Sequence, residues 1–183
     1  GGIFMGMGIL SGLISGMKFK EICDTFLEGC SQVLLGALIV GLSRGVSVIM
    51  NDAMITDTII HALALALQNL PSGITAIGML IVQTILNFLI PSGSGQAVVT
   101  MPIMAPLADL VGVTRQTAVL ALQYGDGFSN IFYPVSGYFM ATLALGHVPY
   151  EKWMKKMLPL FGLWTATAAV FMIIAQAIQW GPF

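Results

Sequence analysis

The feature that most constrains this chain is a series of apolar stretches, each long enough to enter or cross a lipid bilayer. Residues 74–90, 96–108 and 157–180 contain no Asp, Glu, Lys or Arg. A helix needs roughly 20 apolar residues to cross a hydrocarbon core of about 30 Å. Over the whole chain, 57% of the residues are hydrophobic and 8% are charged, whereas soluble domains average roughly 45–50% and 25%. The sequence therefore predicts an all-α integral membrane protein.

The charges and cysteines exclude other classes. Seven basic and eight acidic residues give a net charge of −1 and form no basic stripe, so we expect no nucleic acid as a partner. On one helix, Cys23 and Cys30 would lie about 10 Å apart along the axis, too far for a disulfide. Residues 1–17 lack the basic start and the cleavage site of a signal peptide. We therefore expect a fragment of a longer membrane protein.

Charged and turn-forming residues divide the apolar stretches into predicted segments. In chain order these are two scaffold-type transmembrane helices in residues 1–50 with a cytoplasmic loop at 18–28, an interfacial arm helix at 52–70, a re-entrant hairpin at 74–111, a broken transmembrane helix at 114–145 and a last transmembrane helix at 157–180. Lysines cluster in the first loop and just before the last helix, and the positive-inside rule places both clusters in the cytoplasm.

This orientation decides how residues 52–70 lie. With both lysine clusters on one side, the hairpin must enter and leave from the outside, and residues 52–70 cannot cross the membrane. They are expected to form an amphipathic helix along the outer interface. Asp57 and His61 would face water or headgroups, and the side chains turned inward would be those of Ile59, Leu63 and Leu67.

The middle of the predicted hairpin is the first candidate site. Residues 91–95 read Pro-Ser-Gly-Ser-Gly. Non-helical backbone survives at membrane depth only where protein or water surrounds it. Serine hydroxyls, freed carbonyls and helix ends are the groups that bind a dehydrated Na⁺ or an anionic substrate group. An ordinary loop between two full spans has the same composition, so both interpretations stay open at this point.

A second break is predicted at residues 125–130, which read Gly-Asp-Gly-Phe-Ser-Asn. A charged residue at membrane depth costs at least about 2.5–3.5 kcal/mol and usually marks a functional path. The structural alternative is that Asp126 caps a half-helix. Two broken elements in succession are the pattern that indicates the midplane site of a transporter.

Longer motifs carry a family resemblance. The motifs are Asn-Phe-Leu-Ile-Pro-Ser-Gly-Ser-Gly-Gln at 87–96, Met-Pro-Ile-Met-Ala-Pro-Leu-Ala-Asp at 101–109, Gln-Tyr-Gly-Asp-Gly-Phe-Ser-Asn at 123–130 and Pro-Tyr-Glu-Lys-Trp at 149–153. Together they resemble the C-terminal half of the C4-dicarboxylate anaerobic carrier family, a member of the ion transporter superfamily. The resemblance implies one half of an inverted-repeat transporter with a re-entrant hairpin and a discontinuous transmembrane helix. It also implies a homodimer, multi-pass in the bacterial inner membrane.

The same resemblance implies the site residues. The coupling ion is expected to contact Ser92, Gly93, Ser94, Gly95, Asp126, Ser129 and Asn130. The substrate is expected to contact Ser92, Ser94, Asp126, Asn130 and Pro134. Asn87 and Thr100 would support these residues. No cofactor is expected beyond the coupling ion, Na⁺ or H⁺.

The predicted function is ion-coupled secondary transport of small carboxylates or amino acids, with no enzymatic activity. Divalent-anion symporters read Ser-Asn-Thr at the hairpin tip, whereas residues 92–94 read Ser-Gly-Ser here. The Asp126 carboxylate would repel an anion unless a cation neutralises it, so a basic amino acid or peptide carrier is the alternative. A passive channel is a weaker alternative. A membrane enzyme would need a nucleophile and a base, which we do not find.

One further residue has two possible roles. Arg44 lies near the outer end of its predicted span. Its side chain could extend to the interface and leave its stem in the membrane. Alternatively, it could pair with Asp52 or with the substrate.

Overall fold

The computed structural model describes residues 2–68 and 70–181, the side chains at positions 35 and 47 excepted. Gly1 and Asn69, which belong to two of the predicted segments, lie outside the described residues. The described elements are α1 (Gly2–Ile14), α2 (Phe19–Asp52), α3 (Ile55–Leu67), α4 (Ser72–Leu89), α5 (Gly93–Val111), α6 (Arg115–Ser129), α7 (Gly137–Leu145) and α8 (Tyr150–Ala177). The predicted all-α class is therefore confirmed for the residues described.

Several helices are suited to a bilayer. By length and composition, α4, α5 and α8 could each cross a membrane, and α2 could do so if its two halves form one bent span. The shorter apolar helices α1 and α3 have 13 residues each, about 20 Å at the rise of an α-helix. Neither α1 nor α3, as described, is long enough for a full span.

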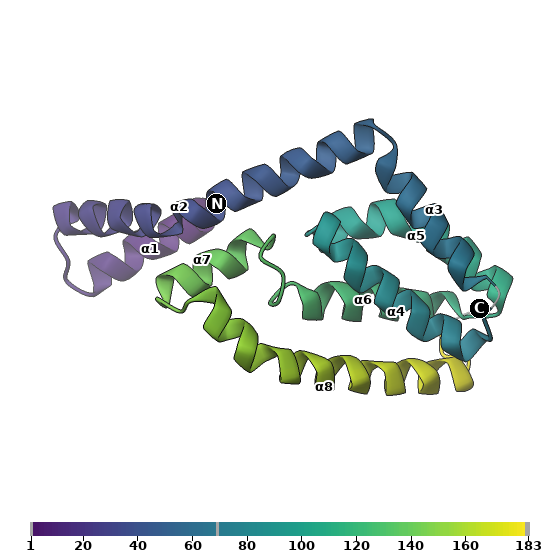
Figure 1. The fold of residues 1–183 in the computed structure, drawn as a ribbon. Coiled ribbons are helices and arrows are strands. Elements are labelled where there is room, and N and C mark those ends of the chain that lie inside the picture. Colours follow the sequence, from purple (N-terminus) through teal and green to yellow (C-terminus); the bar gives the residue numbers. More distant parts are fainter. Residues whose placement is uncertain (1, 69, 182–183) are drawn as a thin grey trace.

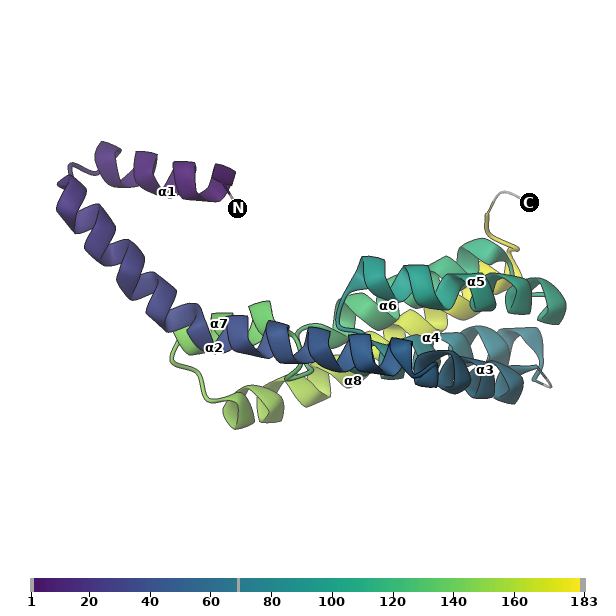
Figure 2. The same ribbon diagram turned by 90° about the horizontal axis from the view of Figure 1, so that it is seen from above.

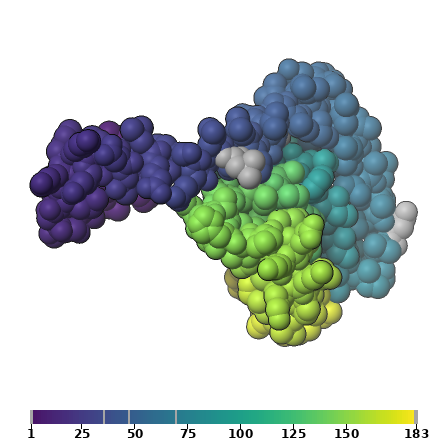
Figure 3. All heavy atoms as spheres, turned by 60° about the vertical axis from the view of Figure 1, so that its left-hand side comes forward, coloured from purple at the N-terminus to yellow at the C-terminus, as the bar shows by residue number. Residues whose placement is uncertain are grey.

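The helices form a packed body and a projecting limb. In the body, α4 lies against α6, and α3, α5 and α8 surround this pair (Figure 1). The centre of the body holds fully buried apolar side chains, among them Met79, Leu86 and Met104. The limb consists of α1 and the first part of α2, which extend away from the body (Figure 3). The candidate site therefore has to be sought in the body.

The structure corrects the predicted cytoplasmic loop at 18–28. Only residues 15–18 connect α1 with α2, and the charged stretch that follows is helical. The Lys18 backbone N–H donates to Glu21 Oε2 (2.8 Å), which satisfies one N–H at the helix start. The stretch holds no proline, and its charged side chains are exposed, so nothing ends the helix there. Instead α2 bends by 43° between Phe19–Leu34 and Gly36–Asp52.

α3 has the predicted polar face and a slightly rotated apolar face. Asp57 and His61 are exposed, and their orientation toward water or headgroups stays a prediction. The fully buried side chains are Thr56, Ile60, Ala64 and Leu67, while Ile59 and Leu63 are only partly buried. Leu67, which belongs to both the predicted and the observed set, occupies the space left by the missing side chain of Gly78 on α4. α3 thus packs against the body of the molecule, in addition to its predicted place at the membrane interface.

α7 belongs with α2 rather than with the body, as the view from above shows (Figure 2). The two helices cross at a pair of glycines. A Cβ atom on Gly36 would lie 2.7 Å from the Gly137 carbonyl oxygen, and one on Gly137 would lie 2.8 Å from that of Gly36. Real Cβ atoms do not approach this closely, so both positions require glycine. The chain therefore passes from the body to α2 between α6 and α7.

Candidate functional site

The hairpin tip, residues 91–95, turns the chain from α4 into α5. Ser92 is the N-cap residue of α5, and its Oγ accepts a hydrogen bond from the Gly95 N–H (3.3 Å). The Ser92 carbonyl accepts from the Gln96 N–H (2.7 Å). The side chains of Ser92 and Ser94 are exposed. Their hydroxyl oxygens and the positive end of α5 therefore remain accessible to a ligand.

The break after α6 lies later than predicted. α6 stays helical through Gly125, Asp126 and Gly127, and the non-helical segment is residues 130–136. We call residues 130–136 the unwound segment. Pro134 lacks an N–H and disfavours helical conformation in the residue before it, so the helix cannot continue through residues 133 and 134. Gly125 is needed for packing instead, because a Cβ there would lie 2.9 Å from the Thr84 backbone nitrogen on α4.

The tip meets the last turn of α6 at the Asp126 carboxylate. A Cβ atom on Gly93 would lie 2.6 Å from Asp126 Oδ2, so only glycine allows this approach. Asn130 Nδ2 donates to the other oxygen, Asp126 Oδ1 (2.9 Å). Asp126 is partly buried, and it lies at the positive end of α5, which favours a negative charge. The structure thus brings together the two segments that the sequence marks as broken.

Asn87 joins α4 to the same turn of α6. Its Nδ2 lies within hydrogen-bonding distance of three acceptors, Ser129 Oγ (2.7 Å), the Asp126 carbonyl (3.2 Å) and Asn130 Oδ1 (3.3 Å). Ser129 Oγ in turn donates to the Gly125 carbonyl. A flipped amide would place the Asn87 oxygen against these acceptors, so this arrangement fixes its orientation.

The other end of the Asn87 amide is the unusual feature. The side chain is only 1% exposed, yet its Oδ1 has no hydrogen-bond partner among the described residues. An unpaired buried acceptor costs about 1–3 kcal/mol, and such groups in native proteins call for an explanation such as a water or an ion. Gln96 Oε1 and Ser136 Oγ are likewise without a partner among the described residues, so the Asn87 oxygen is one of three places where a bound water or ion would be stabilised.

Thr100 lies in a separate polar cluster between the two legs of the hairpin. Gln83 Nε2 donates to Thr100 Oγ1 (3.1 Å), and Gln96 Nε2 donates to both the Gln83 side-chain oxygen and the Gln83 carbonyl (2.7 Å each). All three side chains are buried. The sequence alone assigned neither glutamine a role, although a side-chain amide inside an apolar helix indicates a buried hydrogen bond. Thr100 thus supports the hairpin, and no hydrogen bond joins it to Asp126 or Asn87.

Pro134 lies inside the unwound segment and is exposed. Like Ser92 and Ser94, it makes no hydrogen bond to Asp126 or Asn87 among the described residues. Arg44 is also exposed. Among the described residues, the ion pair found is that of Arg115 with Asp109 (2.6 Å), so the pairing of Arg44 with Asp52 is absent from this conformation.

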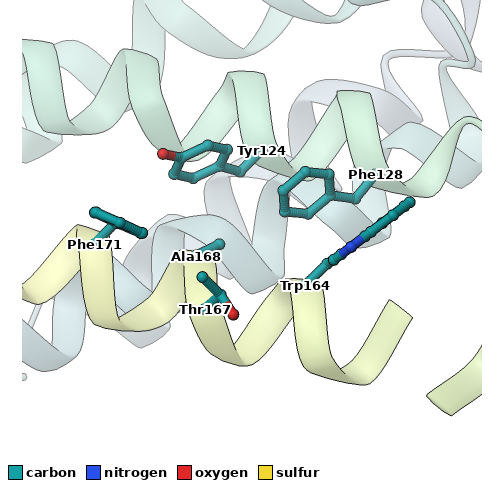
Figure 4. A pocket seen from close by; sticks show the side chains of 6 residues that line it. All are labelled: Tyr124, Phe128, Trp164, Thr167, Ala168 and Phe171. Atoms are coloured by element: carbon teal, nitrogen blue, oxygen red, sulfur yellow. The ribbon is translucent and has the colours of Figure 1, made fainter. Parts of the chain in front are cut away.

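A shallow hollow of about 330 Å³ lies elsewhere, between α6 and α8 (Figure 4). Tyr124 and Phe128 point into it from α6, and Trp164 and Phe171 line it from α8 (Figure 4). Tyr124 and Phe128 are one turn apart, and Asp126 between them projects from the opposite side of the helix. The hollow is therefore separate from the cluster around Asp126.

Comparison with known proteins identifies the family. A family model described as C4-dicarboxylate anaerobic carrier (DcuC) matches residues 2–177. The chain belongs to this family. It is a family of membrane transporters and not of enzymes, in agreement with the resemblance found in the sequence. No solved structure matches the chain.

Two bacterial relatives of this family member are longer proteins. The Escherichia coli (strain K12) protein named "Putative basic amino acid antiporter YfcC" is 40% identical over 94% of this chain and 36% of its own length. An uncharacterized protein of Haemophilus influenzae (strain ATCC 51907 / DSM 11121 / KW20 / Rd) is 34% identical over 96% of this chain and 34% of its own length. The chain thus spans about a third of the length of these relatives.

Proposed function

We propose that this chain carries one half of the substrate and ion site of a secondary transporter in the bacterial inner membrane. The observation that supports this most directly is the contact of the hairpin tip with Asp126, in the turn of α6 that the Asn87 amide holds. A helix end and a carboxylate thus meet at one point. Family membership supplies the reaction class, which is transport.

In this proposal the coupling cation binds between the tip and the end of α6. Hard cations require several oxygen ligands at once. The tip offers the hydroxyls of Ser92 and Ser94. The carbonyls of Gly93 and Gly95, also expected to bind the ion, lie in the first turn of α5, where helical carbonyls accept bonds within the helix. The end of α6 offers Asp126, Ser129 and Asn130, and the free Asn87 oxygen adds a ligand that sequence reasoning treated as a brace. Na⁺ fits this donor set, and H⁺ carried by Asp126 is the alternative.

The substrate is proposed to be a small carboxylate or an amino acid that contacts Ser92, Ser94, Asp126, Asn130 and Pro134. The family description favours a dicarboxylate. Asp126 favours a cationic group instead, because a carboxylate beside the site repels an anion unless a bound cation neutralises it. The name of the Escherichia coli relative refers to basic amino acids, so a basic amino acid antiporter is the second candidate.

The re-entrant hairpin is part of the same proposal. α4 and α5 are each long enough for a full span, but their tip contacts Asp126 inside α6. If α6 and α7 form one broken span, the tip lies inside the membrane rather than at its surface. We also propose that the protein forms a homodimer and that its two lysine clusters lie in the cytoplasm.

Counterflow uptake by the full-length protein in liposomes tests the function. Dicarboxylates, arginine and short peptides compete for uptake of one labelled substrate under imposed Na⁺ and pH gradients. We expect uptake to depend on one of the two gradients and to be blocked by one substrate class. Uptake that depends on neither the Na⁺ nor the pH gradient would instead identify a passive channel.

Cysteine labelling tests the hairpin. Cys23 and Cys30 are exposed and are first replaced by serine. Single cysteines at Gly73 and Gly112 should both react with a membrane-impermeant thiol reagent from the outside, and one at Ser94 should react in one transport state. Labelling of positions 73 and 112 from opposite sides would show two full spans and reject the hairpin.

A further inference from the structure

The unwound segment follows the site residue Ser129 and begins with the site residue Asn130. A break in a membrane helix leaves carbonyl groups without intrahelical partners, and lipid cannot satisfy them. Where these carbonyls find their donors therefore determines how firmly the end of α6 is held. Three of them accept from side chains of other helices, while the Tyr133 carbonyl accepts from the Ser136 N–H (3.2 Å) inside the segment.

Two of the donors lie on the first turn of α8. Trp153 Nε1 donates to the Ile131 carbonyl (3.0 Å), and the Tyr150 hydroxyl donates to the Phe132 carbonyl (3.0 Å). The third donor is Ser43 Oγ on α2, which reaches the Val135 carbonyl (3.2 Å). The carbonyls of residues 131, 132 and 135 are thus paired with neutral donors and are not needed as cation ligands.

Aromatic contacts hold the two α8 donors and the segment in place. The rings of Tyr150 and Trp153 both pack against Phe139 on α7, at centroid distances of 6.3 and 5.8 Å. Phe139 is only 4% exposed. Within the segment, Phe132 stacks on Phe161 of α8 (4.5 Å). The start of α8 is therefore fixed to both sides of the break.

The same contacts continue to Asn87. Phe132 packs against Tyr133 (5.9 Å), and Tyr133 packs edge-on against Phe88 of α4 (5.4 Å). Phe88 directly follows Asn87, whose amide holds Ser129 and Asn130. A displacement of residues 131–133 would therefore also shift Asn87, and with it Ser129 and Asn130.

We propose that Tyr150 and Trp153 are positioning residues of the cation site, which act by holding the carbonyls of residues 131 and 132. The inference rests on the proposed function, because its effect is read in the cation dependence of transport. Neither side chain touches the cation or the substrate. Both act by keeping the end of α6 in the conformation that binds the cation.

The test uses Tyr150→Phe and Trp153→Phe in the full-length transporter. Each change removes one N–H or O–H donor and keeps an aromatic ring against Phe139. Each should raise the cation concentration that gives half-maximal uptake roughly three- to tenfold, the loss of about one hydrogen bond. The KM for substrate at saturating cation and the amount of folded protein should stay as in the wild type.

Matched controls remove an indole N–H and a tyrosine hydroxyl that do not bond to the unwound segment. Trp164→Phe deletes an indole N–H on the same helix, where the ring packs on Phe128. Tyr138→Phe deletes an exposed hydroxyl. Hydrogen exchange supplies a second readout, which should be faster in residues 130–136 in both test variants and unchanged in both controls.

The outcomes separate the two proposals. A wild type whose uptake responds to neither Na⁺ nor H⁺ would reject the proposed function, and the inference with it. A cation-dependent wild type with test variants that behave like the controls would reject the positioning role alone. The same conclusion follows if the substrate KM changes and the cation dependence does not.

Discussion

The hairpin tip and the unwound segment are both breaks between helices, but they are held in different ways. Within the described part of the chain, the hydrogen bonds of residues 91–95 are made by the tip and its own two helices. Three carbonyls of residues 130–136 instead accept bonds from side chains of α2 and α8. The tip contacts α6 through the close packing of Gly93 against Asp126. The unwound segment is held by hydrogen bonds from side chains of other helices.

This difference indicates a division of tasks in the site. A segment braced from two helices keeps Ser129 and Asn130 at fixed positions. A tip without such bonds can move toward or away from them at low cost, because few interactions have to be broken. A cation that binds both would then draw the tip onto a rigid partner. Substitutions at the groups that hold each break test this division.

The largest effect is expected at Asp126, the group shared by both breaks. Asp126→Asn keeps the volume and the hydrogen-bonding reach but removes the charge. A carrier of a cationic substrate should lose about 2–5 kcal/mol of substrate binding, because the partner charge is left unpaired. A dicarboxylate carrier should lose mainly its ion coupling. Substrate affinity measured at saturating Na⁺ distinguishes the two, and a variant with normal affinity and normal coupling would show that Asp126 only caps a helix.

A smaller effect is expected at Asn87, which joins α4 to the rigid partner. Asn87→Ala leaves the Ser129 hydroxyl and the Asp126 carbonyl without this donor and should lower stability by about 1–3 kcal/mol. Thermal unfolding in detergent, with and without Na⁺, measures the change. We also expect Na⁺ to stabilise the wild type more than the variant. Gln123→Ala, an exposed amide on α6, is the control, and equal behaviour of the two variants would contradict the role of Asn87.

The sequence predicted the helical membrane class and both broken regions, because those depend on hydrophobic length and on Gly and Pro. It placed the second break at the glycines of 125–130, whereas the regular structure ends at Ser129 and the non-helical residues are 130–136. Gly125 is instead explained by the close approach of α4, a long-range contact with no local signal. The same limit applies to the site, since neither the Asn87 bonds nor the Tyr150 and Trp153 donors follow from spacing along the chain.

A more modest effect is expected where the tip touches the carboxylate. Gly93→Ala puts a methyl group where Asp126 Oδ2 lies, so the carboxylate must rotate away from the end of α5. That contact is worth about 0.3–1 kcal/mol, and cation affinity should fall accordingly while the fold is kept. Gly127→Ala is the matched control on the other side of Asp126, because a Cβ there meets nothing within 4 Å. Equal cation affinity in the two variants would mean that the tip does not depend on Asp126.

The smallest effect is expected at the ion pair of Asp109 with Arg115, which joins α5 to α6 at the end of α6 remote from Asp126. The Arg115 guanidinium binds both carboxylate oxygens, through Nε at 3.0 and 3.1 Å and Nη2 at 2.6 Å. Both side chains are well exposed, at 68% and 48%, and exposed ion pairs add little to stability because water and salt screen them. Asp109→Asn should therefore leave the melting temperature and the cation dependence of uptake almost unchanged. A loss of coupling as large as that of Asp126→Asn would show that the turn between α5 and α6, and not only the two breaks, controls the position of the tip.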